Sequence, residues 1–405
     1  MPVFTSGRAK MFAAAAFFLL LGVFLRTVMP KPHVWVFAFL SWAAACGFSA
    51  GAARPLAAKY GWLVIMSVFL ALFAAEGWLS LGATGVMPAY VKADIDEVRK
   101  ERGDATLAPY MSNIEKYDPV LGARPRAAAS RTASRFYRDG RMLYDVVYST
   151  LDSGWRVTPQ NPDADKAVVF FGCSFTFGQG LEDEQTIPWR VAELLGPEYQ
   201  VFNFALYGYG AHQMLAQIEN GFVDDIARRY QDVQAFFLTI DGHELRCSGF
   251  EEWVKSGPLY AEENGRVVYK GDIRNMDRPS LPPLRKMLRN CLVFQSIVGS
   301  TPPQSREMRE LHAAIVAESA RQMREKYHAP LTVLLWPDAP FEGQLRGRGL
   351  DPVSLVPALP DWETARSGYY IPYDGHPNAL GADHVARFIA ARVQKRAAAQ
   401  APESE

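Results

Sequence analysis

Long apolar stretches without charge occupy the amino-terminal part of the chain, and short apolar runs alternating with amphipathic segments occupy the rest. The uncharged stretches are 11–25, 33–53 and 60–75. Since about 20 apolar residues cross a bilayer, with about 17 as the lower bound, they predict three membrane helices within 1–85, or two if the first or third is too short. A cleavable signal peptide followed by buried helices is the alternative, but no A-x-A-like cut site follows the first stretch.

The basic residues beside these stretches predict an orientation. Four of them fall on one side of a three-helix arrangement and two on the other: Arg8, Lys10, Arg54 and Lys59 against Arg26 and Lys31. Because basic residues accumulate on the inner side, the amino terminus is expected inside and everything after about residue 90 outside. In a bacterial cell this means the inner membrane, with the large domain periplasmic or otherwise extracytoplasmic.

The segment 86–160 is expected to connect the membrane region to the large domain. Residues 88–135 are rich in Pro, Arg and Lys without a sustained period, which predicts a partly helical linker with a short exposed helix at 93–104. Residues 141–159 alternate apolar and polar positions around "DSG", a pattern typical of a small β-hairpin.

Residues 161–397 repeat the order strand, loop, helix. Runs expected to be strands with both faces buried lie at 167–171, 200–205, 235–240 and 331–336. Helical segments are expected at 186–196, 211–221, 307–327 and 378–396. This alternation predicts an α/β fold, a flavodoxin-like three-layer domain with a doubly wound parallel sheet. The stretch 245–303 breaks the rhythm with prolines and charges and is expected to be an insertion, and 398–405 a disordered tail.

Composition narrows the function only slightly. Lys and Arg together number 43, as do Asp and Glu, so the chain lacks the basic excess that a nucleic-acid binder needs. The four cysteines form no paired C-x-x-C pattern. No nucleic-acid partner, metal or cofactor is therefore expected.

Small polar residues and glycines follow the predicted strands, at the edge where parallel α/β sheets bind ligands. "GCS" brings Ser174 after the first strand, and "NFALYGYG" brings Asn203 and Gly208 after the second. Acyl transfer through serine needs a nucleophile, a base with an orienting acid, and donors for the oxyanion. We predict Ser174 as the nucleophile, the N–H groups of Ser174 and Gly208 as oxyanion donors, and Asn203 as a substrate-binding residue.

The base and its acid are expected just before the last helix. "YDGHPN" carries Asp374 and His376, which predicts His376 as the general base and Asp374 as the group that orients it. Asn378 is the predicted cap of the final helix. Asp374, His376 and His384 could also suggest a metal site, but no fourth ligand is evident.

Four further side chains have more than one interpretation. Cys173 could act as a nucleophile, but a cysteine beside a tight turn is more often a small buried apolar group. Cys247 and Cys291 could form a disulfide in an oxidising compartment. Trp336, at the end of the strand 331–336, could border the acyl pocket or only pack.

These motifs resemble the SGNH/GDSL hydrolase family over about residues 165–395. "FFGCSFTFGQG" resembles the block with the nucleophile, which implies Ser174, and "NFALYGYG" resembles the block whose glycine N–H serves the oxyanion hole, which implies Gly208. "DGHPNALG" resembles the block with the catalytic histidine and acid, here spaced D-x-H instead of D-x-x-H. The family's G-x-N-D asparagine is absent, and "IDGHEL" places His243 there, so the resemblance implies that this ring N–H donates to the oxyanion instead.

The resemblance implies a membrane-anchored serine esterase that acts on an O-acyl ester of a glycan or lipid through an acyl-enzyme intermediate. Two alternatives stay open. One is an O-acyltransferase that modifies a cell-envelope polysaccharide, which would need a membrane partner to supply the acyl donor. The other is a catalytically inert glycan-binding homologue, which the missing asparagine favours.

Overall fold

The structure is a computed structural model. It describes residues 10–11, 13–21, 34–52, 55–86, 114–136, 142–249, 256–276, 306–372 and 374–400. These residues fall into two compact units, one with the amino-terminal helices and one with all described residues from Ile114 onward.

The amino-terminal unit contains two helices with defined bounds, α2 (Val34–Ala52) and α3 (Leu56–Val86). They pack through aromatic side chains, with the rings of Trp42 and Phe69 5.6 Å apart. Within the described residues, Leu56–Glu76 is the one segment long and apolar enough to cross a membrane, with a mean hydropathy of 1.9, and each of its residues except the buried Glu76 is partly or fully exposed. Phe37–Ala50 is apolar but shorter. Of the three predicted spans, 60–75 thus lies in a segment that meets this test, 33–53 contains the shorter apolar helix, and part of 11–25 lies outside the described residues.

A five-stranded parallel sheet forms the centre of the large unit, in the order β11-β10-β7-β5-β6. Its strands are β5 (Lys166–Phe171), β6 (Tyr199–Asn203), β7 (Asp232–Thr239), β10 (Leu331–Leu335) and β11 (Val353–Ser354). Counted from β6 in chain order this is 2-1-3-4-5, the order of flavodoxin-like doubly wound sheets. The chain reverses direction across the sheet between β5 and β7, which makes their carboxyl ends the expected ligand-binding edge.

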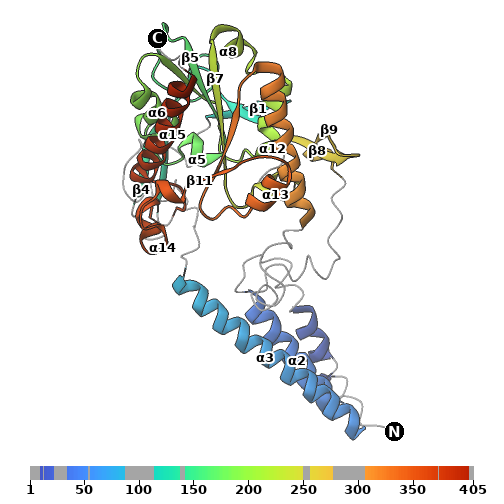
Figure 1. Ribbon diagram of the computed structural model, residues 1–405. Helices are drawn as coiled ribbons and strands as arrows, with labels where there is room; N and C mark the ends of the chain where they lie inside the picture. Colours follow the sequence, from blue (N-terminus) through green and yellow to red (C-terminus); the bar gives the residue numbers. More distant parts are fainter. Residues whose placement is uncertain are drawn as a thin grey trace, which may run out of the picture. The chain divides into compact units, whose positions relative to one another are not determined.

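Helices cover both faces of this sheet (Figure 1). Helices α6 (Ile187–Leu195) and α15 (Ala379–Gln400) pack on one face, and α7 (Ala211–Glu219) and α12 (Arg306–Tyr327) pack on the other. Because side chains alternate along a strand, neighbouring residues of β5 enter different cores: Phe170 joins the α6 and α15 side, and Phe171 joins the α7 and α12 side. The predicted α/β architecture is confirmed at this level.

Within the described residues, the other helices of the large unit are short. They are α5 (Ser174–Phe177), α8 (Asp224–Arg229), α9 (His243–Cys247), α13 (Glu342–Gly347) and α14 (Trp362–Ala365), with 3-10 turns η1 (Asp183–Gln185), η2 (Ile273–Asn275), η3 (Val356–Ala358) and η4 (Arg366–Tyr369). Helix α15 runs to Gln400, so the first residues of the predicted disordered tail are helical, and 401–405 lie outside the described residues.

Strands replace much of the expected linker. Residues 114–136 contain β1 (Glu115–Asp118), β2 (Gly122–Pro125) and β3 (Ser130–Phe136), and β3 pairs antiparallel with β4 (Met142–Ser149). The hairpin expected within 141–159 is reduced to one bridge, Thr150 to Arg156. The reason is that β4 alternates buried and exposed residues over its full length, so it needs a partner strand of similar length. The expected helix at 93–104 lies outside the described residues.

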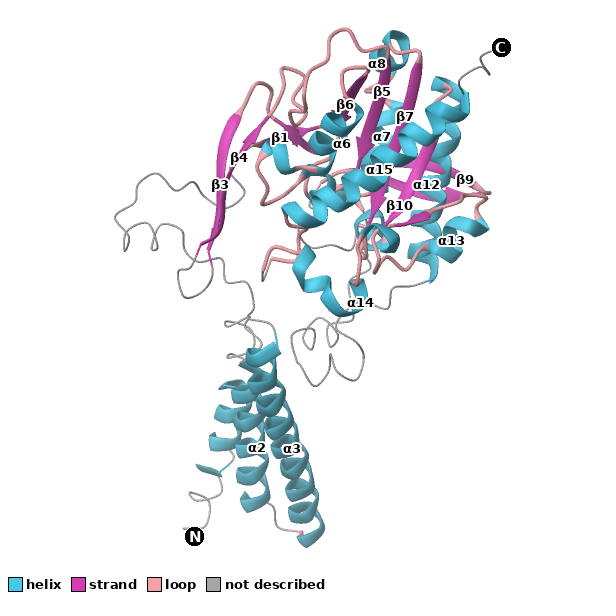
Figure 2. Ribbon diagram, turned by 60° about the vertical axis from the view of Figure 1, so that its left-hand side comes forward, coloured by secondary structure: helices cyan, strands magenta, loops and turns pink. Residues whose placement is uncertain are grey.

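We call β3 and β4 together the β3–β4 arm; Figure 2 shows it beside the main sheet rather than within it. The predicted insertion, where described, contains a further antiparallel pair, β8 (Pro258–Glu263) and β9 (Arg266–Asp272). The hydroxyl of Tyr260 on β8 donates to the Glu219 carboxylate on α7 at 2.6 Å, which fixes this pair to the domain.

Candidate active site

Ser174 is the first residue of α5, directly after β5 and the turn at Gly172 and Cys173. The turn requires glycine at position 172, because a Cβ there would collide with the side chain of Thr176. Ser174 is 5 % exposed, and its hydroxyl contacts the Cys173 sulfur at 3.9 Å. The strand therefore ends in a sharp turn that places this hydroxyl at the carboxyl edge of the sheet.

The acid and base lie on the loop between η4 and α15. Asp374 Oδ1 accepts a hydrogen bond from Nδ1 of His376, and the Asp374 side chain is fully buried while that of His376 is 17 % exposed. Asn378 ends this loop, since its side-chain oxygen accepts from the N–H of Gly381 at 2.9 Å, which confirms the predicted cap of α15. With Nδ1 occupied, Nε2 is the ring nitrogen left to accept a proton.

The ring of Phe175 connects the two halves of the candidate site. Its centroid lies 5.6 Å from that of the His376 ring, and Phe175 directly follows Ser174 in the chain. Within the described residues no hydrogen bond joins the Ser174 hydroxyl to His376. Such bonds are often long without substrate and shorten when it binds.

Two backbone N–H groups are available for an oxyanion. Those of Ser174 and Gly208 donate no hydrogen bond within the described part of the chain. Ser174 opens a helix, where the first N–H groups have no intrahelical partner. Gly208 has φ +87°, a left-handed conformation that glycine adopts without strain.

Asn203 and Trp336 lie near these groups but are engaged in packing. Asn203 is fully buried at the end of β6, with its amide nitrogen donating to the Thr176 carbonyl at 3.3 Å and its oxygen accepting from the Ala205 N–H at 3.1 Å. These contacts tie the α5 turn to the loop after β6. Trp336 is 2 % exposed, one layer behind Phe175, with ring centroids 5.0 Å apart. A substrate contact for either residue stays a prediction.

His243 packs against His312 in the core, with ring centroids 6.1 Å apart. It is fully buried on α9, with Nδ1 3.1 Å from the Thr239 hydroxyl, which also lies 3.2 Å from Nε2 of His312. Burial lowers the pKa of His243 well below its usual value, and the nearby charge of Arg246 lowers it further. Among the described residues its Nε2 has no hydrogen-bond partner, and the expected oxyanion role stays a prediction.

The described cysteines are free thiols. Cys173 is fully buried, as expected for a small apolar group beside a turn. Cys247 is also a free thiol, with its sulfur 3.7 Å from Nδ1 of His312, and its predicted partner Cys291 lies outside the described residues. Burial raises the pKa of the Cys247 thiol to about 12, which keeps it protonated.

Two arginines that the sequence did not single out support the candidate site. Arg135, from β3, forms an ion pair with Oδ2 of Asp374. Arg156 is fully buried between the rings of Tyr148 and Phe177, and its guanidinium donates at 2.7 Å to each of three backbone carbonyls just after Ser174. The sequence around these two arginines did not indicate their roles, because an arginine in a short polar stretch is usually exposed.

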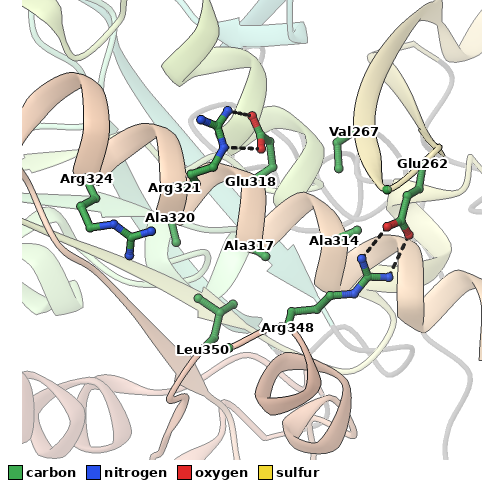
Figure 3. Close-up of a pocket in the computed structure, with 12 residues that line it drawn as sticks. Glu262, Val267, Ala314, Ala317, Glu318, Ala320, Arg321, Arg324, Arg348 and Leu350 are labelled. Carbon is green, nitrogen blue, oxygen red and sulfur yellow. Dashed lines mark hydrogen bonds and ion pairs between the residues drawn. The ribbon is translucent and has the colours of Figure 1, made fainter.

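A cavity of about 270 Å³ lies elsewhere on the domain, between β8–β9, α12 and the loop after α13 (Figure 3). Two of its arginines are neutralised by neighbouring carboxylates, Arg321 by Glu318 and Arg348 by Glu262, while Arg324 also lines it. None of the predicted catalytic residues lines this cavity. It is therefore not the candidate active site.

The fold and the site define a parallel α/β protein with a serine, a histidine–aspartate pair and free N–H groups at the carboxyl edge of its sheet. No protein-family model and no curated protein matches the chain. Among solved structures, Est24, a carbohydrate acetylesterase from Sinorhizobium meliloti, aligns with 57% of this chain and 99% of its own, at 9% identity and a TM-score of 0.30. A TM-score this low does not indicate a shared fold or function.

Proposed function

We propose that this chain is a membrane-anchored serine esterase of the SGNH type, which cleaves an O-acyl ester of a glycan or a lipid. The observation that carries the proposal is the placement of His376, held by the buried Asp374 and lying against Phe175, the residue next to Ser174. The free N–H groups of Ser174 and Gly208 add the donors that an acyl-transfer site needs.

The reaction follows from these groups. Ser174 Oγ attacks the ester carbonyl carbon while Nε2 of His376 takes the hydroxyl proton, and the two free N–H groups stabilise the resulting oxyanion. The tetrahedral species collapses, the C–O bond to the alcohol breaks, and the alcohol leaves with the proton from His376. Water then attacks the acyl-enzyme with His376 again as base, which releases the carboxylic acid and restores Ser174. Asp374 holds the imidazole with Nε2 free throughout.

We further propose that the amino-terminal helices anchor the domain in a membrane, with the catalytic residues on its outer side. The length and apolar composition of Leu56–Glu76 support an anchor, and the distribution of basic residues supports the orientation. Lys116→Cys, at an exposed position of the large unit, tests the orientation. Labelling in intact cells by a membrane-impermeant maleimide is expected, and labelling only after lysis would reverse it.

The catalytic proposal is tested by labelling the purified full-length chain, in detergent, with a fluorophosphonate. Wild type and the control Ser153→Ala, which removes an exposed hydroxyl, should be labelled and should hydrolyse p-nitrophenyl acetate. Ser174→Ala should do neither while keeping its circular dichroism spectrum. A folded wild-type chain that is unlabelled and inert would leave the inert glycan-binding homologue. Transfer of acetyl to an added oligosaccharide, in place of release as acetate, would favour the acyltransferase and its need for a donor partner.

A further inference from the structure

The β3–β4 arm docks on the segment that follows the proposed nucleophile. The Tyr148 hydroxyl on β4 accepts a hydrogen bond from the Gly180 N–H at 2.8 Å, and the Val147 N–H donates to the Glu182 carboxylate at 2.8 Å. Gly180 also fits closely between the rest of the arm and the acid–base loop, since a Cβ there would meet the Tyr144 ring at 3.0 Å and would collide with Ile371. The arm therefore contacts both halves of the candidate site.

The other strand of the arm reaches the acid itself. Arg135 on β3 forms an ion pair with Oδ2 of Asp374, while His376 occupies Oδ1. Each carboxylate oxygen thus has its own partner. Oδ2 pairs with Arg135, which precedes Asp374 in the chain, and Oδ1 pairs with His376, which follows it. The Asp374 side chain is fully buried and that of Arg135 is 17 % exposed, so the pair is shielded from water.

This arrangement fixes the carboxylate more firmly than a histidine alone would. The charged and titratable groups that act on Asp374 are His376 from its own loop and Arg135 from the arm. Burial raises the pKa of Asp374, but the hydrogen bond from His376 and the charge of Arg135 outweigh it and hold the pKa below its usual value. Without Arg135, a buried carboxylate would keep one partner, become free to rotate about its χ2 bond, and take up a proton more readily.

We propose that Arg135 is a positioning residue of the active site, and that the β3–β4 arm is therefore part of the catalytic machinery instead of a spacer between membrane and enzyme. The inference rests on the proposed esterase function. Arg135 acts through Asp374: by holding Oδ2, it keeps Oδ1 aligned with Nδ1 of His376, and so keeps Nε2 directed toward the serine.

The test compares three variants of the full-length chain in detergent with p-nitrophenyl acetate as substrate. Arg135→Gln should lower kcat by about 10- to 100-fold with little change in KM, because a misoriented base affects the chemical step and not substrate binding. The acidic side of the pH–activity profile of Arg135→Gln should move to higher pH, because Asp374 takes up a proton more readily. Arg135→Lys, which keeps the charge without the planar fork, should recover part of kcat.

Arg131→Gln is the matched control, since Arg131 lies on the same strand, is exposed, and among the described residues donates only to the backbone carbonyl of Ser130. If Arg135→Gln is as active as Arg131→Gln, or if Arg135→Lys is no better than Arg135→Gln, the positioning role is wrong while the esterase stands. A loss of kcat without a shift of the acidic side of the pH–activity profile would also count against it. A wild-type chain inert to ester and fluorophosphonate overturns the esterase, and this inference with it.

Discussion

Acid should destabilise the large domain because its core contains imidazoles that fold in their neutral form. His212 and His312 are fully buried, and neither ring nitrogen of His212 has a hydrogen-bond partner among the described residues. Burial lowers the pKa of each from 6.5 to about 3; the charges of Arg246 and His312 contribute in the case of His212. The folded state therefore excludes protons that the unfolded chain binds.

The direction and magnitude of the change in the free energy of unfolding follow from this difference in proton binding. Below pH 6.5 the unfolded chain binds more protons, so the free energy of unfolding falls as pH falls, and keeps falling until the folded pKa near 3. Between about pH 7 and about pH 5, each of these histidines should cost about 2 kcal/mol, or about 4 kcal/mol for the two. That is a large share of the roughly 5–15 kcal/mol that stabilises a typical domain. Glu244 acts in the opposite direction, because burial raises its pKa and the folded state then gains a proton.

The substitution His312→Phe isolates the contribution of His312 to this pH-dependent loss of stability. Phenylalanine suits a site whose ring already packs against Phe341, with centroids 4.5 Å apart, and it carries no proton at any pH. Urea unfolding of the full-length chain in detergent, followed by near-ultraviolet circular dichroism at about pH 7 and about pH 5, gives the loss for each variant. We expect the variant to lose about 2 kcal/mol less than wild type over this range.

His328→Asn is the control for this series. His328 is exposed and has φ +53°, a conformation that asparagine tolerates, so the exchange removes an imidazole without touching the core. It should lose as much stability as wild type. An equal pH dependence in wild type and His312→Phe would refute the reasoning, because His312 would then not be a neutral group that must be protonated on unfolding.

Three further substitutions test the supports of the site. Arg156→Met should lower the free energy of unfolding by about 3–5 kcal/mol, since three buried carbonyls lose their donor, and an unchanged urea midpoint would contradict this. Asn378→Ala should cost about 1 kcal/mol as a lost helix cap, read from the melting temperature, against no loss for Ser153→Ala. Gly208→Ala keeps the backbone N–H but should lower the free energy of unfolding by about 1–2 kcal/mol through its left-handed backbone, and an unchanged urea midpoint would contradict this.

The elements that the sequence predicted well are those whose cause is local. The strand 167–171 is apolar at every position, so it can only be buried on both faces, and the structure contains it as β5. Asn378 could be recognised as a cap because capping involves only the next few residues. The proximity of Asp374 and His376 likewise follows from their spacing of two residues.

Contacts between distant segments had no such signal. In a stretch such as "SRTASRF" the pattern does not tell an exposed arginine from a paired one, and the partner of Arg135 lies 239 residues further along the chain. The burial of His243 had no such signal either, since it depends on packing against α12, which follows much later in the chain; its expected oxyanion role stays a prediction.

The sequence by itself therefore determined the alternation of strands and helices, the turn that presents Ser174, and the pairing of Asp374 with His376, because each depends on the chemistry of adjacent residues. Only the tertiary structure decided that the segment expected to be a linker forms strands, and that one of them brings Arg135 to the acid. It also decided that three histidines share the core. These outcomes depend on which surfaces meet when the sheet and its helices pack, and packing is a property of the whole chain.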